Sequence, residues 1–219
     1  MGLPALPRRY HPASIWLLYA VGLFPAAWTF YLGATGQLTG NPVKVFEHLL
    51  GEWALRFLIL TLMISPLRDL AGINWLRYRR ALGLLAFWYV VLHFSANMIL
   101  DKRLAFDVIV EDITKRWFIT IGMAALVMLI PLALTSNAWS IRRLGSRWTL
   151  LHRLIYPIAA LGALHFCLSV KVIGPEQLVY AGLVILLIGW RLVRPRYMAW
   201  RRSRRSVNTG LAPAGPRPK

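Results

Sequence analysis

The sequence predicts an all-α fold: an integral membrane bundle of six transmembrane helices with both termini on the cytoplasmic side. Of the 219 residues 58% are hydrophobic, and the mean hydropathy is +0.53, which is too apolar for a soluble globular domain. The apolar residues fall into six segments, each close to the ~20 residues that cross a bilayer. Basic residues are concentrated in alternate connections between these segments.

The six apolar segments are expected to be helices, because backbone polar groups in lipid must be satisfied within the segment itself. They run Ile15–Ala34, Glu47–Leu67, Ala81–Leu100, Trp117–Ser136, Trp148–Val170 and Gln177–Val193. The chain therefore divides into a cytoplasmic N-terminus (1–14), a six-helix membrane domain (15–193) and a basic cytoplasmic tail (194–219). The tail is rich in Arg, Ser, Pro and Gly, and we expect it to be disordered.

The distribution of charge sets the predicted orientation. Arginines crowd the connections after the second and fourth segments: Arg68, Arg77, Arg79, Arg80, Arg142, Arg143 and Arg147. Nine more basic residues lie between Arg191 and Lys219. The connection from about residue 101 to 116 instead holds four acids, and we expect a solvated connector there, with a docking surface as the alternative. The positive-inside rule then places both termini in the cytoplasm.

The net charge of +18 follows from this topology and from attraction of the basic tail to membrane lipids, so we expect no nucleic-acid binding. The single cysteine, Cys167, excludes an intrachain disulfide framework and an iron–sulfur cluster held by cysteines of this chain alone. Glycine-rich phosphate loops and dinucleotide fingerprints are absent from the sequence. The composition therefore points away from a soluble catalytic domain.

Two histidines lie deep inside separate apolar segments. His93 precedes Asp101 by eight residues and His165 precedes Lys171 by six. At a helical rise of 1.5 Å per residue, both imidazoles fall roughly 10 Å below the same, outer membrane face. A buried titratable ring is usually kept because it binds something. Matched depth on two helices favours a pair of axial ligands to a haem iron over plain hydrogen bonds between helices.

The neighbours of these histidines agree with that hypothesis. Small or polar residues lie within about one helical turn of them, where they would let a flat macrocycle approach: Ala96, Asn97, Gly162 and Ser169. Glu52 and Arg56 stand four residues apart in the second segment and predict either an internal ion pair or an Arg56 contact with a haem propionate. The high cost of a lipid-facing arginine at that depth favours the propionate contact.

His152 lies near the cytoplasmic start of the fifth segment, thirteen residues before His165. A second, inner haem would need a partner at the same depth on the third segment, where Arg79 and Arg80 stand instead of histidine. Three interpretations stay open: a ligand of a second haem with an unusual partner, a contact to a flavin or quinone, and a structural interfacial residue. His11 and His48 are interpreted as interfacial residues.

Four runs of sequence carry a resemblance to a known family. They are NPVKVFEHLLGEWALRFLILTLMISPLRD (41–69), RRALGLLAFWYVVLH (79–93), LGSRWTLLHRLIYPIAALGALHFCLSVK (144–171) and GPEQLVYAGL (174–183). Together they resemble the MsrQ family, also called YedZ, within the ferric-reductase-like transmembrane group. The similarity covers most of the chain from about residue 41 to 190.

The resemblance implies a function and a set of ligands. The important histidines of the family fall on His93, His152 and His165, and the cofactors it implies are b-type haem, one or two per chain, and FMN. The family lies in the bacterial inner membrane. It draws electrons from the respiratory quinone pool and hands them to a periplasmic, molybdopterin-containing enzyme that reduces methionine sulfoxide in damaged envelope proteins. The wider group commonly carries two haems on two histidine pairs.

This chain departs from the wider group in two ways. It lacks a fourth deep histidine, and it lacks the cytoplasmic flavin and nicotinamide domain, so its donor should be a separate molecule, a quinone or a flavin reductase. We therefore expect an electron-transfer subunit of a two-component reductase, with no catalytic residues of its own. The alternatives are a self-sufficient ferric or cupric reductase and a cofactor-free membrane scaffold or transporter.

Overall fold

The computed structural model describes residues 10–208, and within that range the chain forms helices and no strand. Six helices are long and apolar enough to cross a membrane, which confirms the predicted all-α membrane bundle. They are α1 (His11–Ala34), α2 (Pro42–Ala71), α3 (Arg79–Ala96), α5 (Trp117–Leu134), α8 (Ile155–Leu168) and α9 (Pro175–Asn208). The third span also includes η2 (Leu76–Tyr78) and the π-helical η3 (Asn97–Asp101), and the fifth includes α7 (Ser146–Leu151) and η4 (His152–Leu154).

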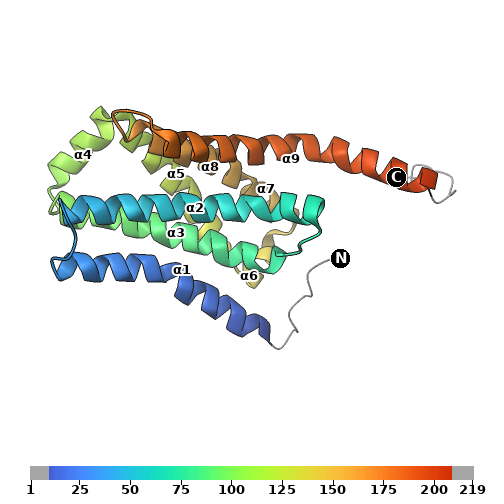
Figure 1. The fold of residues 1–219 in the computed structure, drawn as a ribbon, viewed down its shortest axis with the longest axis horizontal. Helices are drawn as coiled ribbons and strands as arrows, with labels where there is room; N and C mark the ends of the chain where they lie inside the picture. The colour runs from blue at the N-terminus through green and yellow to red at the C-terminus, as the bar shows by residue number, and fades with distance from the viewer. Residues whose placement is uncertain (1–9, 209–219) are drawn as a thin grey trace.

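Successive spans run in opposite directions, so α1 begins and α9 ends at the same end of the bundle (Figure 1). We call this the α6 end, because the short helix α6 (Ala138–Leu144) lies there. The short helix α4 (Phe106–Lys115) lies at the opposite, α4 end. Helix α2 is central, packing against α1, α3, α8 and α9, while α5 packs along α8. Half of the most apolar stretch of α2 is buried, against 6% in α9.

The ends of α2 follow from local sequence chemistry. The side chain of Asn41 accepts hydrogen bonds from two backbone N–H groups in the first turn, at 3.1 and 3.2 Å, and Pro42 occupies the first helical position. Gly72, with φ of 72°, ends the helix in the left-handed conformation that glycine adopts without steric cost. These caps make α2 longer than the apolar stretch Glu47–Leu67 from which it was predicted.

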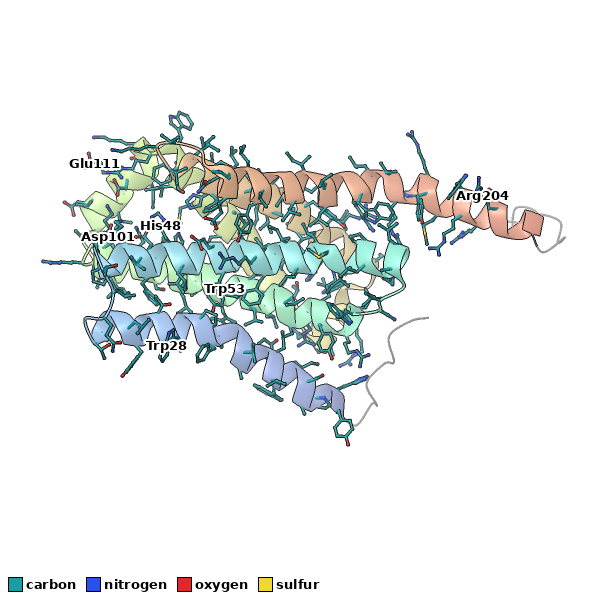
Figure 2. The ribbon with its side chains drawn as sticks, in the orientation of Figure 1. Trp28, His48, Trp53, Asp101, Glu111 and Arg204 are labelled. Carbon is teal, nitrogen blue, oxygen red and sulfur yellow. The ribbon has the colours of Figure 1, made fainter. Side chains whose placement is uncertain are left out.

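The core lies between α2, α3 and α8. Its most completely buried side chains include Leu50, Leu85, Tyr89 and Ile158. The hydroxyl of Tyr89 donates a 2.7 Å hydrogen bond to the carbonyl of Gly22, which ties α3 to α1. Large apolar side chains elsewhere point outward, as expected where lipid is the solvent. Figure 2 shows these outward side chains along the length of the bundle.

The 101–116 connection and the tail both contain helix that the apolar pattern did not predict. The connection contains α4, an amphipathic helix that is mostly exposed and buries Ile109 and Asp112. The tail was predicted to be disordered from residue 194, but α9 continues to Asn208. Arg194 pairs with the buried carboxylate of Asp69, and Arg201 donates to its carbonyl at 2.6 Å, so the extension is anchored to α2. Residues 1–9 and 209–219 lie outside the described range.

Candidate cofactor site between two histidines

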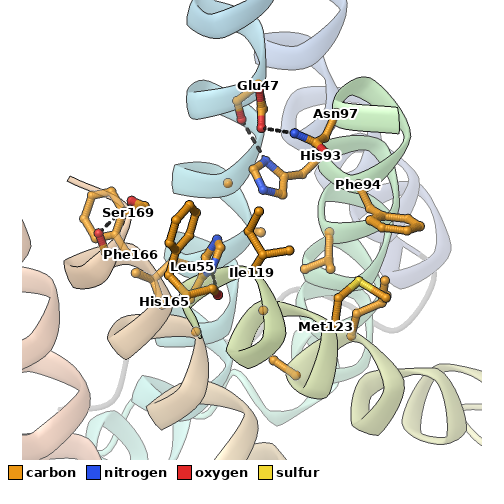
Figure 3. A pocket seen from close by; sticks show the side chains of 18 of the residues that line it. Glu47, Leu55, His93, Phe94, Asn97, Ile119, Met123, His165, Phe166 and Ser169 are labelled. Atoms are coloured by element: carbon orange, nitrogen blue, oxygen red, sulfur yellow. Dashed lines mark hydrogen bonds between the residues drawn. The ribbon is translucent and has the colours of Figure 1, made fainter. Parts of the chain in front are cut away.

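His93 on α3 and His165 on α8 lie on opposite sides of a cavity of about 360 Å³ at the α4 end (Figure 3). Their ring centroids are 6.1 Å apart and their planes stand at 80°. The structure thus brings together the two histidines that the sequence placed at matched depth. A metal held by two imidazole nitrogens, with bonds of about 2.0 Å, requires ring centroids roughly 6 Å apart. The spacing therefore suits one metal ion between the rings.

Each histidine uses its Nδ1 nitrogen for a hydrogen bond to a backbone carbonyl. His93 Nδ1 is 2.9 Å from the carbonyl oxygen of Glu47, and His165 Nδ1 is 2.7 Å from that of Phe118. A carbonyl oxygen only accepts hydrogen bonds, so each Nδ1 must carry the ring proton. In a neutral imidazole with its proton on Nδ1, Nε2 keeps its lone pair, which is the state in which histidine binds metal.

Two glycines make room for the rings. A Cβ atom built on Gly51 of α2 would lie 3.3 Å from His93 Cε1, and one built on Gly122 of α5 would lie 2.9 Å from His165 Nδ1. Sequence reasoning missed both residues. Their signal was a glycine in the middle of an apolar helix, where it costs about 0.5–1 kcal/mol relative to alanine and usually has a packing reason.

The small residues that the sequence singled out have mixed positions. Gly162 and Ser169 line the cavity, but the Cβ position of Gly162 faces leucines of α2 rather than His165. Asn97 also lines the cavity and donates a 2.8 Å hydrogen bond to the carboxylate of Glu47, the residue whose carbonyl holds His93. Ala96 is buried in the core and is not part of the cavity wall. Asn97 is therefore a support for the His93 side of the site.

Arg56 lies outside the set of residues that line this cavity. Its Nη2 is 2.9 Å from Glu52, so the ion pair, the less favoured of the two alternatives, is present, and its Nε donates to the hydroxyl of Tyr180 at 2.6 Å. Glu176 is a further partner at 3.7 Å. The guanidinium also lies 5.0 Å from the ring centre of Trp53. These contacts join α2 to α9 and supply the Arg56 guanidinium with hydrogen-bond and charge partners beside the cavity.

His152 lines a second cavity, of about 290 Å³, toward the α6 end. Its ring stacks on Trp148 with centroids 3.9 Å apart, and its Nε2 lies 3.1 Å from the hydroxyl of Thr135. The expected arginines are present in the same wall, which includes Arg79, Arg80, Arg153 and Arg191. Leu129 lines both cavities, so one leucine side chain forms part of the wall of each.

The remaining two histidines differ from each other. His11, at the start of α1, contacts Arg77 of the third span. His48 is exposed but contributes to the wall of the cavity that holds His93 and His165, so it lies closer to the site than an ordinary interfacial residue. Figure 2 shows His48 at the α4 end of α2.

Comparison with known proteins gives close and nearly full-length relatives. The profile of the family described as "Ferric reductase like transmembrane component" matches residues 50–163. A protein of Rhizobium meliloti is 65% identical over 97% of this chain and 99% of its own length, and one of Agrobacterium fabrum is 56% identical over 94% and 96%. A Brucella anthropi protein is 63% identical over 83% of each chain.

All three relatives bear the name "Protein-methionine-sulfoxide reductase heme-binding subunit MsrQ". No solved structure matches the chain. The identities, the coverage and the family profile agree with one another. This chain belongs to the MsrQ family of ferric-reductase-like transmembrane proteins.

Proposed function

We propose that this protein is a b-type haem electron-transfer subunit of a protein-methionine-sulfoxide reductase system. One observation carries the proposal: two imidazoles on different helices line one cavity, with their rings 6.1 Å apart and each Nδ1 hydrogen-bonded to a backbone carbonyl. The names of the relatives, which describe a haem-binding subunit of such a reductase, support it.

The residues of the cavity fit a haem. His93 and His165 would hold the iron through Nε2, and Gly51 and Gly122 leave the imidazoles room. The deep wall is apolar, with Leu55, Leu58, Leu126, Leu129 and Ile158 all at most 8% exposed. A haem held by histidine on both faces takes up and releases single electrons and has no open position for oxygen chemistry. The role of the protein is then to hold, orient and insulate the group.

The charge distribution supports a direction of transfer. The basic connections and the arginines of α9 lie at the α6 end, whereas Asp101, Asp107, Glu111 and Asp112 lie at the α4 end. The positive-inside rule assigns the α6 end to the cytoplasm, with both termini inside, in the bacterial inner membrane. Electrons would then pass from the cytoplasmic side to the cavity of His93 and His165 and leave on the periplasmic side.

Electrons would enter at the second cavity. His152, stacked on Trp148 and surrounded by arginines, suits a flat, anionic group. A second haem and FMN are both flat and anionic, whereas a quinone is flat but uncharged and would use only the stacking surface of the ring. The donor would be the respiratory quinone pool or a flavin reductase. Leu129 in both cavity walls would bring the two groups close to one another. The acceptor would be a periplasmic molybdopterin-containing subunit that reduces methionine sulfoxide.

The test is a two-component assay. Purified protein, reduced under anaerobic conditions, is mixed with its periplasmic catalytic partner and a methionine-sulfoxide protein, and its reoxidation is followed by absorbance. We expect reoxidation that requires both the partner and the sulfoxide. His93→Ala and His165→Ala should abolish the signal. Rapid reoxidation by ferric chelates with none by the partner would instead support the self-sufficient ferric reductase, and a protein without haem would support the scaffold or transporter.

A further inference from the structure

The cavity between His93 and His165 is charged at one end only. Its deep wall is formed by buried leucines and isoleucine, as described above. Every lysine and arginine in its wall lies at the α4 end: Lys44, Lys102 and Arg116. A ligand with an apolar body and ionised carboxylates would be stable here in one orientation, with the carboxylates toward the α4 end, because burying them among leucines would be costly.

Two of these cations, Lys102 and Arg116, already form ion pairs with a carboxylate. Asp112 of α4 is only 8% exposed, and its Oδ2 lies 2.6 Å from Lys102 Nζ while its Oδ1 lies 2.9 Å from Arg116 Nε. A buried carboxylate is tolerated when it is paired in this way. The contacts demonstrate that Lys102 and Arg116 stand where they can bind carboxylate oxygens at the cavity wall.

The two terminal guanidinium nitrogens of Arg116 are available as hydrogen-bond donors. It pairs with Asp112 through Nε, and across residues 10–208 no ion pair engages its two terminal nitrogens. Those nitrogens form the fork that binds carboxylates in a bidentate manner. The Lys44 ammonium is more committed, since it lies 3.1 Å from Glu47 and 3.1 Å from Asp101. Lys102 is intermediate in how far its charge is already paired, since its ammonium lies 2.6 Å from Asp112 and 3.5 Å from Asp101.

We propose that Arg116, with Lys102 beside it, binds the propionate carboxylates of the haem. This inference rests on the proposed function and replaces Arg56 as the propionate contact, since Arg56 is engaged by Glu52 and Tyr180 and does not line the cavity. The carboxylate edge of the haem then faces the α4 end, and its apolar edge faces Leu129. Electrons leave through the edge nearest the periplasmic acceptor.

The experiment compares Arg116→Gln and Lys102→Gln with Lys115→Gln. Lys115 is the matched control, because it neighbours Arg116 and is also exposed, at 72% against 55%, but does not line the cavity, and within residues 10–208 its one ion pair is with Glu111. In holoprotein, transfer of haem to an excess of a haem-free acceptor protein should be about tenfold faster in Arg116→Gln, the size of effect expected for one charge-assisted hydrogen bond. Lys102→Gln should show a smaller increase, and Lys115→Gln none.

A second measurement separates a propionate contact from general loosening of the fold. Resonance Raman spectra of the holoproteins report the propionate bending mode, which should shift in Arg116→Gln and stay unchanged in Lys115→Gln. Arg116→Lys keeps the charge but loses the fork, so it should restore part of the haem retention. It also takes the place of Arg116→Gln if that variant purifies without haem. An unshifted propionate band, or equal haem loss in Arg116→Gln and Lys115→Gln, would overturn the inference.

The two proposals fail in different ways. A wild-type protein that contains no low-spin haem contradicts the proposed function. A wild-type protein that binds haem through His93 and His165, with Arg116→Gln indistinguishable from Lys115→Gln, contradicts only the orientation of the haem.

Discussion

Each of the two cavity histidines donates a hydrogen bond from Nδ1–H to a backbone carbonyl, and this bond leaves Nε2 as the ring nitrogen that can bind iron. The carbonyl acceptors belong to Glu47 and Phe118, residues 46 and 47 positions away in the sequence. The depth of His93 and His165 could be predicted from helical rise alone. Their tautomer could not, because it depends on which carbonyl of another helix comes within reach after packing.

The glycines beside the rings provide a graded test at the residue scale. In Gly122→Ala the new methyl would lie 2.9 Å from His165 Nδ1 and must displace the ring, whereas in Gly51→Ala it would lie 3.3 Å from His93. We expect Gly122→Ala to lower haem content clearly and to destabilise the protein by about 1–3 kcal/mol, the usual cost of overpacking. The Gly51→Ala effect should be smaller. Haem content per chain and thermal unfolding in detergent measure both.

Gly189→Ala is the matched control for these variants. Gly189 lies in a membrane helix with no neighbouring atom within 4 Å of its Cβ position, so alanine should be accepted with a small gain in stability. Equal haem content in all three variants would contradict the role given to Gly51 and Gly122.

His152 is the residue whose role the sequence left most open. Its stacking partner Trp148 lines the second cavity with it, while Thr135, whose hydroxyl lies 3.1 Å from its Nε2, lines neither cavity. We therefore expect His152→Ala to keep the low-spin spectrum that depends on His93 and His165, and to slow reduction of the protein by a quinol or by a flavin reductase. Haem per chain in wild type and variant then separates the alternatives. A loss of one of two haems identifies an iron ligand. An unchanged ratio with slower reduction identifies a flavin or quinone contact, and an unchanged ratio with unchanged reduction identifies a structural residue.

At the scale of the helix, apolar length predicted the six spans, but it could not predict where charged helices continue past the membrane. Helix α9 continues to Asn208 because Arg194 and Arg201 find acceptors on Asp69 of α2. Helix α4 escaped prediction because its ten residues mix charged and apolar side chains and are too few to register as a span. For α9 the stabilising partner is far away in the sequence and is absent from the local pattern, whereas α4 pairs with nearby residues such as Lys102 and packs on the adjacent α5.

The α9 anchor can be tested by Asp69→Asn. The Asp69 side chain is 2% exposed and pairs with Arg68 and Arg194, whose side chains are 34% and 25% exposed. Breaking a fully buried pair costs 3–5 kcal/mol, and the partial exposure of the arginines reduces the expected loss to about 1–3 kcal/mol. Thermal unfolding should show this loss, and trypsin should cleave the 194–208 extension faster.

Glu111→Gln serves as the control for Asp69→Asn. It removes an exposed pair, in which Glu111 and Lys115 are 57% and 72% exposed, so little change in stability is expected. If Asp69→Asn and Glu111→Gln were equally stable and equally resistant to trypsin, the anchoring role of Asp69 would be wrong.

For the whole molecule, the arrangement of the spans places the two cavities toward opposite ends of the bundle. The cavity of His93 and His165 opens at the α4 end, and that of His152 lies toward the α6 end. The sequence predicted this asymmetry from the depths of three histidines. It could not predict the shared wall residue Leu129, because that depends on how α5 packs against α8 and α3.

The orientation can be measured by cysteine labelling in a Cys167→Ser background. A membrane-impermeant maleimide applied to intact spheroplasts should label Lys115→Cys at the α4 end and leave Arg202→Cys at the α6 end unlabelled. Permeabilised cells should give labelling of both. Labelling of Arg202→Cys in intact spheroplasts would reverse the assigned direction of electron transfer.

The central claim is that one haem iron is bound between His93 and His165, and an absorption spectrum of detergent-purified protein tests it most directly. After reduction with dithionite we expect the split bands of a low-spin, six-coordinate b-type haem in the wild type. His93→Ala and His165→Ala should each lose the bands of this haem, because each removes one axial ligand, while His48→Ala should keep them. Low-spin bands of wild-type intensity per chain in either of the first two variants would contradict the account.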